Sequence, residues 1–252
     1  MTDLPRAAPQ AFGVDPTRRE RYSLRQSRYA ALAEDINAWA AACATSGRTL
    51  SLLDVGCGWG VLLRHLEFQP HFADLTVSGT EHENTSFQYK KELYQEFFVG
   101  DLSGGYPQIP SNRYDVVVCE QVLEHLANVD IAIDTLARVL RPGGKLIVGV
   151  PIFPPPLHLA RKHIVPRLAR ILRHPETANH QQAFSLYSLL RVLRRHPDLT
   201  VLTVRGFRII SGGLLRPLEN YRWWWQLNRK LGEQIPAVCI EVQVTLEKSG
   251  TG

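Results

Sequence analysis

The stretch Leu52-Leu-Asp-Val-Gly-Cys-Gly-Trp-Gly60 decides the fold of this chain. Its apolar start predicts a short buried strand, and Gly56, Gly58 and Gly60 come next, where the backbone must turn tightly. Residues 61–66 then continue with helical periodicity. A strand, a bare turn and a helix start present backbone N–H groups and the positive end of a helix to a ligand. The stretch therefore predicts a nucleotide cradle, with glycines spaced more tightly than the Gly-x-Gly-x-x-Gly dinucleotide fingerprint.

Outward from this stretch, strand and helix patterns alternate along the chain. The run at 114–119 is almost continuously apolar, as a strand buried on both faces requires, and Pro142-Gly-Gly144 predicts a tight turn before the next strand. This alternation predicts an open, mostly parallel sheet with helices on both faces. We expect strands at 50–55, 75–80, 97–99, 114–119, 145–150, 200–205 and 237–246, and helices at 17–44, 60–68, 84–96, 129–140 and 185–195.

The chain divides into three segments by composition. Residues 1–16 are rich in Pro and Ala and predict a flexible tail, 17–48 predict an N-terminal helical cap, and 49–252 predict the main α/β domain. The strand and helix rhythm breaks after Val150, where prolines open an insertion at about 151–182. This insertion lies between the strand expected at 145–150 and the helix expected at 185–195.

Charge is distributed unevenly between the two halves. Residues 1–140 hold 12 Lys/Arg and 18 Asp/Glu, a net charge of 12 − 18 = −6, and residues 141–252 hold 17 and 6, a net charge of 17 − 6 = +11. Within the insertion, 157–174 is basic and amphipathic, which is typical of a segment that contacts a membrane surface or an acidic partner. The alternative is an active-site lid with solvated arginines. Of the three tryptophans at 223–225, we expect at least one to be exposed, since a helix cannot turn all of them to one core.

Cysteine usage and the first residues predict a cytoplasmic protein. The four cysteines are scattered and form no Cys-x-x-Cys pair, which suits a reducing compartment. The chain starts without the basic and apolar regions of a signal peptide, and no apolar run is long enough to span a bilayer. We therefore expect a cytoplasmic location, with contact to the membrane periphery left open by the insertion.

Five motifs in order resemble those of the class I S-adenosylmethionine-dependent methyltransferases. They are Asp54-Val-Gly-Cys-Gly-Trp-Gly60, Val77-Ser-Gly-Thr-Glu81, Val99-Gly-Asp-Leu102, the segment 114–126 and Arg141-Pro-Gly-Gly-Lys145. The likeness is greatest to small-molecule enzymes of the ubiquinone O-methyltransferase type. It implies a Rossmann-like, seven-stranded sheet whose last strand is antiparallel, a place that 237–246 would fill.

The resemblance also implies which residues hold S-adenosyl-L-methionine. Glu81 would accept hydrogen bonds from the ribose hydroxyls, Asp101 would meet the adenine amino group and Leu102 would pack on the ring. Asp54 has a second interpretation as an organiser of the loop N–H groups, and Glu81 has one as an exposed loop acid. The full predicted set comprises Asp54, Gly56, Cys57, Gly58, Glu81, His82, Asp101, Leu102, Glu120 and Gln121.

Two histidines are the candidate catalytic bases. His125 lies on a short helix at the cleft, and His180 precedes the helix expected at 185–195. Metal-assisted relatives carry Glu-x-x-Glu-His at the first of these places, but here the first position is Gln121, a poorer ligand for a hard cation. We therefore expect no metal. Glu124 and His125 have the alternative role of orienting the loop.

The sequence thus predicts methyl transfer to a hydroxyl or amine of an apolar small molecule or lipid-like precursor. Two alternatives stay open, an RNA 2′-O-methyltransferase and a non-catalytic S-adenosylmethionine-binding adaptor. A nucleic-acid partner is not expected, because the chain contains no recognisable RNA-binding module. The basic segment 157–174 is the expected place of membrane contact.

Overall fold

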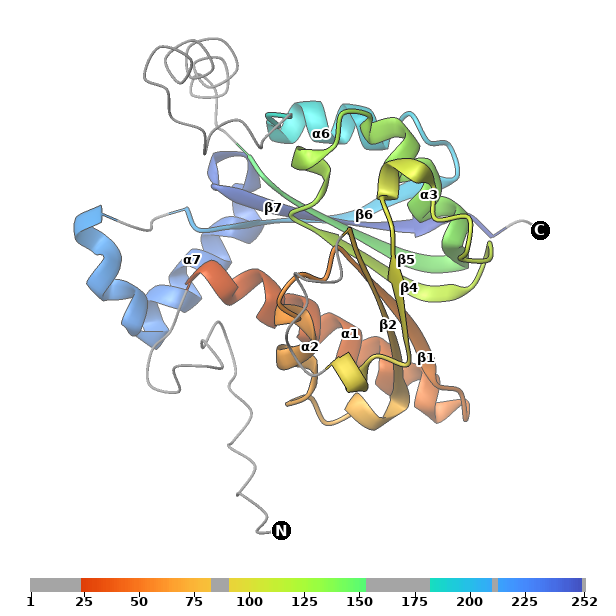
Figure 1. Cartoon of the computed structure of the whole chain (residues 1–252). Coiled ribbons are helices and arrows are strands. Elements are labelled where there is room, and N and C mark those ends of the chain that lie inside the picture. Colours follow the sequence, from red (N-terminus) through yellow and green to blue (C-terminus); the bar gives the residue numbers. More distant parts are fainter. Residues whose placement is uncertain (1–23, 83–90, 153–181, 210–212, 251–252) are drawn as a thin grey trace.

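A seven-stranded sheet organises the chain in the computed structural model, which describes residues 24–82, 91–152, 182–209 and 213–250 (Figure 1). The strand order is β3-β2-β1-β4-β5-β7-β6. Only β7 runs against its neighbours, antiparallel to both β5 and β6. The strands are β1 (Leu50–Val55), β2 (Leu75–Glu81), β3 (Glu96–Val99), β4 (Tyr114–Glu120), β5 (Leu140–Pro151), β6 (Leu199–Phe207) and β7 (Glu241–Lys248).

Helices cover both faces of this sheet (Figure 1). On one face, α1 (Ser27–Thr45) and α2 (Val61–Leu66) bury Leu32, Ile36 and Leu63 in a core shared with β1, β2 and β4. On the other, α3 (Val129–Val139) and α6 (Leu186–Leu193) pack against β4, β5 and β7. The long helix α7 (Arg222–Gln234) lies beside α1 and the end of β6.

The predicted fold class and the reversed last strand are therefore confirmed. Each of the seven expected strands is present, β1 with the predicted bounds and the others with shifted ends. Burial explains the agreement, since β4 and β5 are apolar on both faces and are covered from both sides. Of the three adjacent tryptophans, Trp223 is exposed and Trp224 and Trp225 are buried, as expected.

The helix expected at 84–96 is wrong in its last part. Residues 83–90 lie outside the described residues, and the chain then forms a 3-10 turn, Lys91–Leu93, before β3 starts at Glu96. Pairing of β3 with β2 and insertion of the Tyr94 ring beneath Gly79 decide this region, because tertiary contacts override a weak helical propensity. At the N-terminus, α1 begins at Ser27 after a 3-10 turn at Leu24–Gln26, and 1–23 are not described.

The turn expected at Pro142-Gly-Gly144 lies inside a strand. Pairing along β4 steps from Leu140 to Lys145 while the partner advances from Tyr114 to Val116, so the residues between bulge out of the ladder. Gly143 adopts the left-handed conformation that this bulge needs, with φ +75°. At the other end of the chain, β7 begins at Glu241, after a 3-10 turn at Pro236–Val238 where we expected strand.

The insertion begins and ends at one place on the sheet. Its residues 153–181, which include the basic segment 157–174 and His180, lie outside the described residues. Ile152 and Phe184, on either side, form an isolated parallel bridge. Among the described helices, none is long and apolar enough to cross a membrane.

Candidate functional site

The glycine turn after β1 is built as the sequence predicts. Gly56, Gly58 and Gly60 all have positive φ, at +67°, +48° and +66°, and Gly60 leads directly into α2. A Cβ at Gly56 would collide with the Val122 side chain 2.5 Å away, whereas a Cβ at Gly58 would meet only the Glu81 carboxylate at 3.9 Å. The turn is therefore packed on its Gly56 side and bare at Gly58.

Glu81 closes β2 beside this turn. Its Oε2 accepts a 2.7 Å hydrogen bond from Gly58 N–H, and its Oε1 accepts one of 2.9 Å from His82 N–H. A carboxylate has about four acceptor positions, so two are left for a ligand that donates hydrogen bonds. The predicted ribose acceptor is thus held in place at the turn, and the His82 backbone takes part in holding it.

Two other predicted cofactor residues lie beneath the turn. The Asp54 carboxylate is buried and accepts a 3.2 Å hydrogen bond from Tyr94 O–H, and burial raises the pKa of Asp54 to about 7. The Cys57 side chain is also buried, and its N–H donates to Thr80 O at 3.0 Å. Tyr94, which sequence reasoning missed, therefore fixes the carboxylate under the loop. The Cys57 N–H and C=O are both bonded within the protein, because Gly60 N–H donates to Cys57 O at 2.9 Å, so ligand contact at Cys57 stays a prediction.

At the next strand end, Asp101 and Leu102 take different positions. Asp101 is exposed, and its Oδ1 accepts a 2.8 Å hydrogen bond from Ser103 N–H, which caps a 3-10 turn. The Leu102 side chain is 3% exposed and packs into the main core. Asp101 thus presents a carboxylate at the same edge of the sheet as Glu81. Packing of Leu102 on a ring stays a prediction.

Glu120 and Gln121 mark the end of β4. Gln121 has a positive φ of +59°, an uncommon conformation for a residue with a side chain, and its N–H donates to Gly149 O at 2.8 Å. Such strain is concentrated at functional sites. Glu120 lies across Gly149, where any Cβ would overlap its carboxylate. Both residues therefore stand at the carboxyl edge of the sheet, where open α/β sheets bind ligands.

A buried acidic network extends from Glu120 away from the glycine turn. Arg28 of α1 pairs with Glu120 through Nε at 2.8 Å and with Glu241 through Nη1 at 2.9 Å. Gln243 Nε2 donates to Glu120 Oε2 at 3.0 Å, and Arg208 pairs with Glu241 at 2.9 Å. Burial raises the pKa of Glu120 to about 7, against the opposing effect of Arg28. We use the name acidic network for Arg28, Glu120, Glu124, Arg208, Glu241 and Gln243.

Of the two candidate bases, the structure describes His125 but not His180. His125 is exposed, with Nε2 3.9 Å from Glu124 Oε1. His180 lies outside the described residues. Glu124 itself is 1% exposed, and burial raises its pKa to about 7. From the sequence, Glu124 was weighed as part of a metal-binding pattern and as an orienter of the loop, and nothing in the local pattern indicates its burial.

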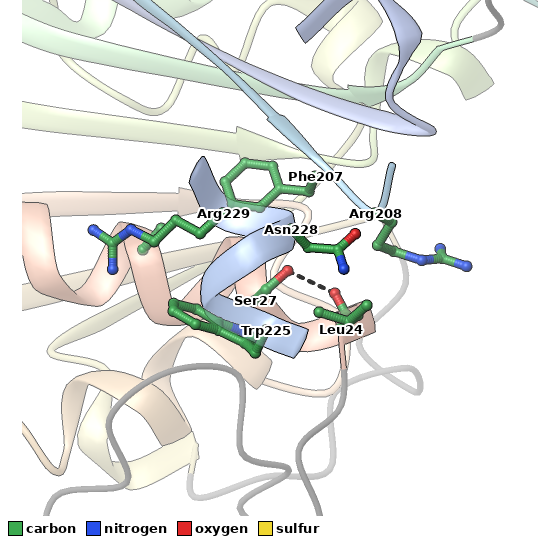
Figure 2. Close-up of a pocket in the computed structure, with 8 residues that line it drawn as sticks. Leu24, Ser27, Phe207, Arg208, Trp225, Asn228 and Arg229 are labelled. Atoms are coloured by element: carbon green, nitrogen blue, oxygen red, sulfur yellow. Dashed lines mark hydrogen bonds between the residues drawn. The ribbon is translucent and has the colours of Figure 1, made fainter. Parts of the chain in front are cut away.

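Two hollows lie away from this edge. The first, between α1, α7 and the end of β6, is lined by residues that include Ser27, Phe207 and Trp225 (Figure 2), and its volume of about 10 Å³ suits one water molecule. The second, about 360 Å³, lies at the amino ends of β1 and β4 beside Arg48 and Arg141. It is at the end of the sheet opposite the glycine turn.

The residues at the turn fit an adenosyl cofactor. The turn is bare at Gly58, Glu81 is oriented with acceptor positions to spare, and Asp101 is exposed at the neighbouring strand end. These groups suit a ribose diol and a base amino group, as the resemblance implies. In the described part of the chain, no group of three or more His, Cys, Asp or Glu side chains could hold a metal ion.

Comparison with known sequences gives one family and several relatives. A family described as "Methyltransferase domain" matches residues 17–204. The ubiquinone biosynthesis O-methyltransferase of Rickettsia akari is 31% identical over 101 residues, which are 40% of this chain and 39% of that protein. The enzyme of the same name from Agrobacterium fabrum is 27% identical over 110 residues. The match spans about two fifths of the length of these curated relatives.

Solved structures share the fold at low sequence identity. The putative methyltransferase in complex with the Trm112 activator of Haloferax volcanii has a TM-score of 0.55 at 15% identity, covering 85% of this chain and 97% of that one. The [4+2]-cyclase SpnF has a TM-score of 0.55 at 17% identity, covering 95% and 87%. A methyltransferase and a cyclase therefore share this architecture, so the fold alone does not fix the reaction.

Proposed function

Because this chain belongs to the S-adenosylmethionine-dependent methyltransferase family, we propose that it methylates a hydroxyl or amine of an apolar small molecule or lipid-like precursor. The observation that supports the cofactor in this proposal is the glycine turn, where Gly58 N–H orients the Glu81 carboxylate through a 2.7 Å hydrogen bond. The acceptor class is supported by the partial matches to ubiquinone biosynthesis O-methyltransferases.

The cofactor supplies a methyl group that is already activated on a sulfonium, so positioning accounts for much of the rate. The protein must then bind the adenosyl part, orient the acceptor and receive a proton. Glu81, Asp101 and the glycine turn would bind the adenosyl part at one edge of the sheet. The end of β4 and the start of β7 would lie beside the acceptor.

A labelled-methyl screen tests the reaction. The protein is incubated with methyl-labelled S-adenosylmethionine and either a metabolite and lipid extract or an RNA pool, and labelled products are identified by mass spectrometry. Label in an apolar small molecule supports the proposal. Label confined to RNA, with oligonucleotide affinity that falls steeply with salt, would replace it with the RNA 2′-O-methyltransferase. Cofactor binding with no labelled product in any pool would indicate an adaptor.

Membrane contact through 157–174 is the second part of the proposal, supported by the basic, amphipathic pattern of that segment. The test is co-sedimentation with vesicles that contain anionic lipid. Deletion of 157–174 should abolish binding. Full retention would contradict this role and would turn attention to the described apolar side chains of Leu214, Tyr221 and Trp223, which are 99%, 55% and 54% exposed.

A further inference from the structure

Glu124 differs from the other carboxylates of the acidic network. Glu120 and Glu241 each pair with an arginine within 3 Å. Within the described part of the chain, the one oppositely charged group within 4.0 Å of Glu124 is the exposed His125, whose Nε2 lies 3.9 Å from Oε1. Its other oxygen, Oε2, is buried and has no hydrogen-bond partner among the described residues. A buried polar atom left in this state calls for an explanation.

Glu124 lies at the edge of the sheet where open α/β sheets bind ligands. It lies on the 3-10 turn Leu123–His125, three residues after the strained Gln121 at the carboxyl end of β4. Its main-chain oxygen accepts a 3.0 Å hydrogen bond from the N–H of Gln182, the last residue of the insertion. The insertion therefore ends on the turn that carries this carboxyl group, at the edge of the sheet where ligands bind.

Other unsatisfied acceptors are found in the same network. Glu241 Oε2 and Gln243 Oε1 are buried without a hydrogen-bond partner among the described residues. Glu124, Glu241 and Gln243 are 1%, 6% and 1% exposed. The free atoms of these three residues are oxygens that accept hydrogen bonds, and Arg208 Nε, a donor without a hydrogen-bond partner among the described residues, belongs to an arginine already paired with Glu241. A partner that satisfies these oxygens must donate hydrogen bonds, which a hydroxyl or an amine does.

We propose that the Glu124 carboxylate takes up the proton that the acceptor hydroxyl or amine releases on methylation. This rests on the proposed function. The acceptor oxygen or nitrogen forms a bond to the methyl carbon, the carbon–sulfur bond breaks and its electron pair stays on sulfur. The proton passes from the acceptor to Glu124 and is lost to solvent after the product leaves. Glu120 and Glu241 are held as counterions of Arg28 and Arg208, which leaves Glu124 for this role.

The charges around Glu124 suit a proton acceptor near neutral pH. Burial raises its pKa to about 7, a main-chain hydrogen bond at Glu124 and the charge of Arg28 of α1 lower the pKa, and Glu241 of β7 raises it. Glu120 and Cys119 of β4 also lie near enough to interact electrostatically, and His125 belongs to the same turn. A base is most effective when its pKa is near the working pH.

The test compares Glu124→Gln with wild type and with Glu247→Gln. The first variant keeps the size of the side chain but cannot take up a proton. The second makes the same substitution near the C-terminal end of β7, where Glu247 pairs with Lys145. With the acceptor found in the labelled-methyl screen, Glu124→Gln should lower turnover by about 100-fold or more, with S-adenosylmethionine affinity within twofold of wild type. Glu247→Gln should match wild type in both.

Each outcome has a consequence. Turnover of Glu124→Gln within threefold of wild type would overturn this proposal and leave the proposed function intact. Loss of wild-type turnover in EDTA with recovery in Mg²⁺ would assign the carboxylate to a metal and overturn it too. A wild-type protein that labels nothing contradicts the proposed function itself, and this inference with it.

A stability measurement needs no acceptor. A carboxyl group with a raised folded pKa contributes stability that is present below about pH 4.5 and is lost as the pH rises through about 7. The thermal midpoint of Glu124→Gln should therefore fall less than that of wild type between pH 4.5 and 8. Identical pH dependence of the two proteins would show that Glu124 titrates normally, which would overturn the proposal.

Discussion

Two regions at the same side of one sheet are assembled differently: the cofactor edge, formed by the glycine turn 56–60, Glu81 and Asp101, and the acidic network. At the cofactor edge, the bonds from Gly56 to Thr80 and from Gly58 to Glu81 join residues 24 and 23 positions apart. In the network, Gln243 reaches Glu120 and the main chain of Arg28 across 123 and 215 positions. The cofactor edge is formed by strands that are close in sequence. The acidic network forms only when distant parts of the chain have folded together.

We therefore expect substitutions in the two regions to have different effects, on ligand affinity at the cofactor edge and on the free energy of unfolding in the acidic network. The cofactor edge consists mainly of backbone groups and partly exposed carboxylates, so changes there should affect a ligand more than the protein. The network places charges in the interior, where one unpaired member is costly. Substitutions in the two regions test that contrast, from the largest expected effect to the smallest.

Arg28→Ala should have the largest effect. It leaves Glu120 without its arginine partner and Glu241 with only Arg208, and breaking a buried ion pair costs about 3–5 kcal/mol. Urea denaturation at pH 8 measures this loss as a change in the free energy of unfolding. The exposed pair of Arg195 with Asp130 gives the control, because Arg195→Ala should cost less than about 1 kcal/mol. Equal costs for the two variants would contradict the contrast.

Glu81→Ala should weaken cofactor binding by more than about 1 kcal/mol, the scale of a hydrogen bond to a charged group. Calorimetric titration with S-adenosylmethionine measures the change, and Glu92→Ala, on the exposed turn before β3, is the control. The free energy of unfolding should change little, since Glu81 is partly exposed. Unchanged cofactor affinity would remove Glu81 from the ribose role.

Gly58→Ala and Gly143→Ala form a matched pair. Both glycines have positive φ, and a Cβ at either position would meet little or nothing, so each variant should lose about 1–2 kcal/mol of stability from backbone strain alone. Only Gly58 lies at the cofactor edge, so only Gly58→Ala should also lower S-adenosylmethionine affinity. Equal affinities in the two variants would show that the turn does not contact the ligand.

Asp54→Asn should change the pH dependence of stability. Because burial raises the folded pKa of Asp54 to about 7, its protonated form contributes stability below about pH 4 that is lost as the pH rises through 7. Asparagine does not titrate, so the variant should lose less stability than wild type between pH 5 and pH 8. Urea denaturation at both values measures this, with the exposed Asp198→Asn as control. If Asp54→Asn lost as much stability as wild type between pH 5 and pH 8, a group other than Asp54 would account for the pH dependence.

Local pattern was enough to predict most of the strands, and the family resemblance supplied the rest of the fold. The bounds of β1 and the position of Glu81 at the end of β2 follow from apolar runs and glycine spacing, whereas the antiparallel last strand was implied by the resemblance. The same logic failed at 84–96, where Tyr94 packs under Gly79 and bonds to Asp54 instead of continuing a helix. Those contacts depend on tertiary structure that a local window does not contain.

The acidic network could not be predicted from the sequence either, because its contacts also depend on tertiary structure. Arg28 reads as one charged residue among several on a helix, and no spacing rule connects it with Glu120 or Glu241. The burial of Glu124 likewise depends on packing around the turn after β4. Its pattern suggested a relation to Gln121 and His125 in a degenerate metal-binding motif, and His125 is exposed. The predicted role of His180 stays a prediction, as that residue is not among those described.

The most direct test of the division between the two regions is one calorimetric series with S-adenosylmethionine. Wild type, Glu81→Ala and Glu124→Gln are titrated under the same conditions at pH 7. We predict 1:1 binding to wild type, affinity at least about fivefold weaker for Glu81→Ala, the equivalent of 1 kcal/mol, and wild-type affinity for Glu124→Gln. Unchanged affinity for Glu81→Ala together with lost affinity for Glu124→Gln would contradict the account.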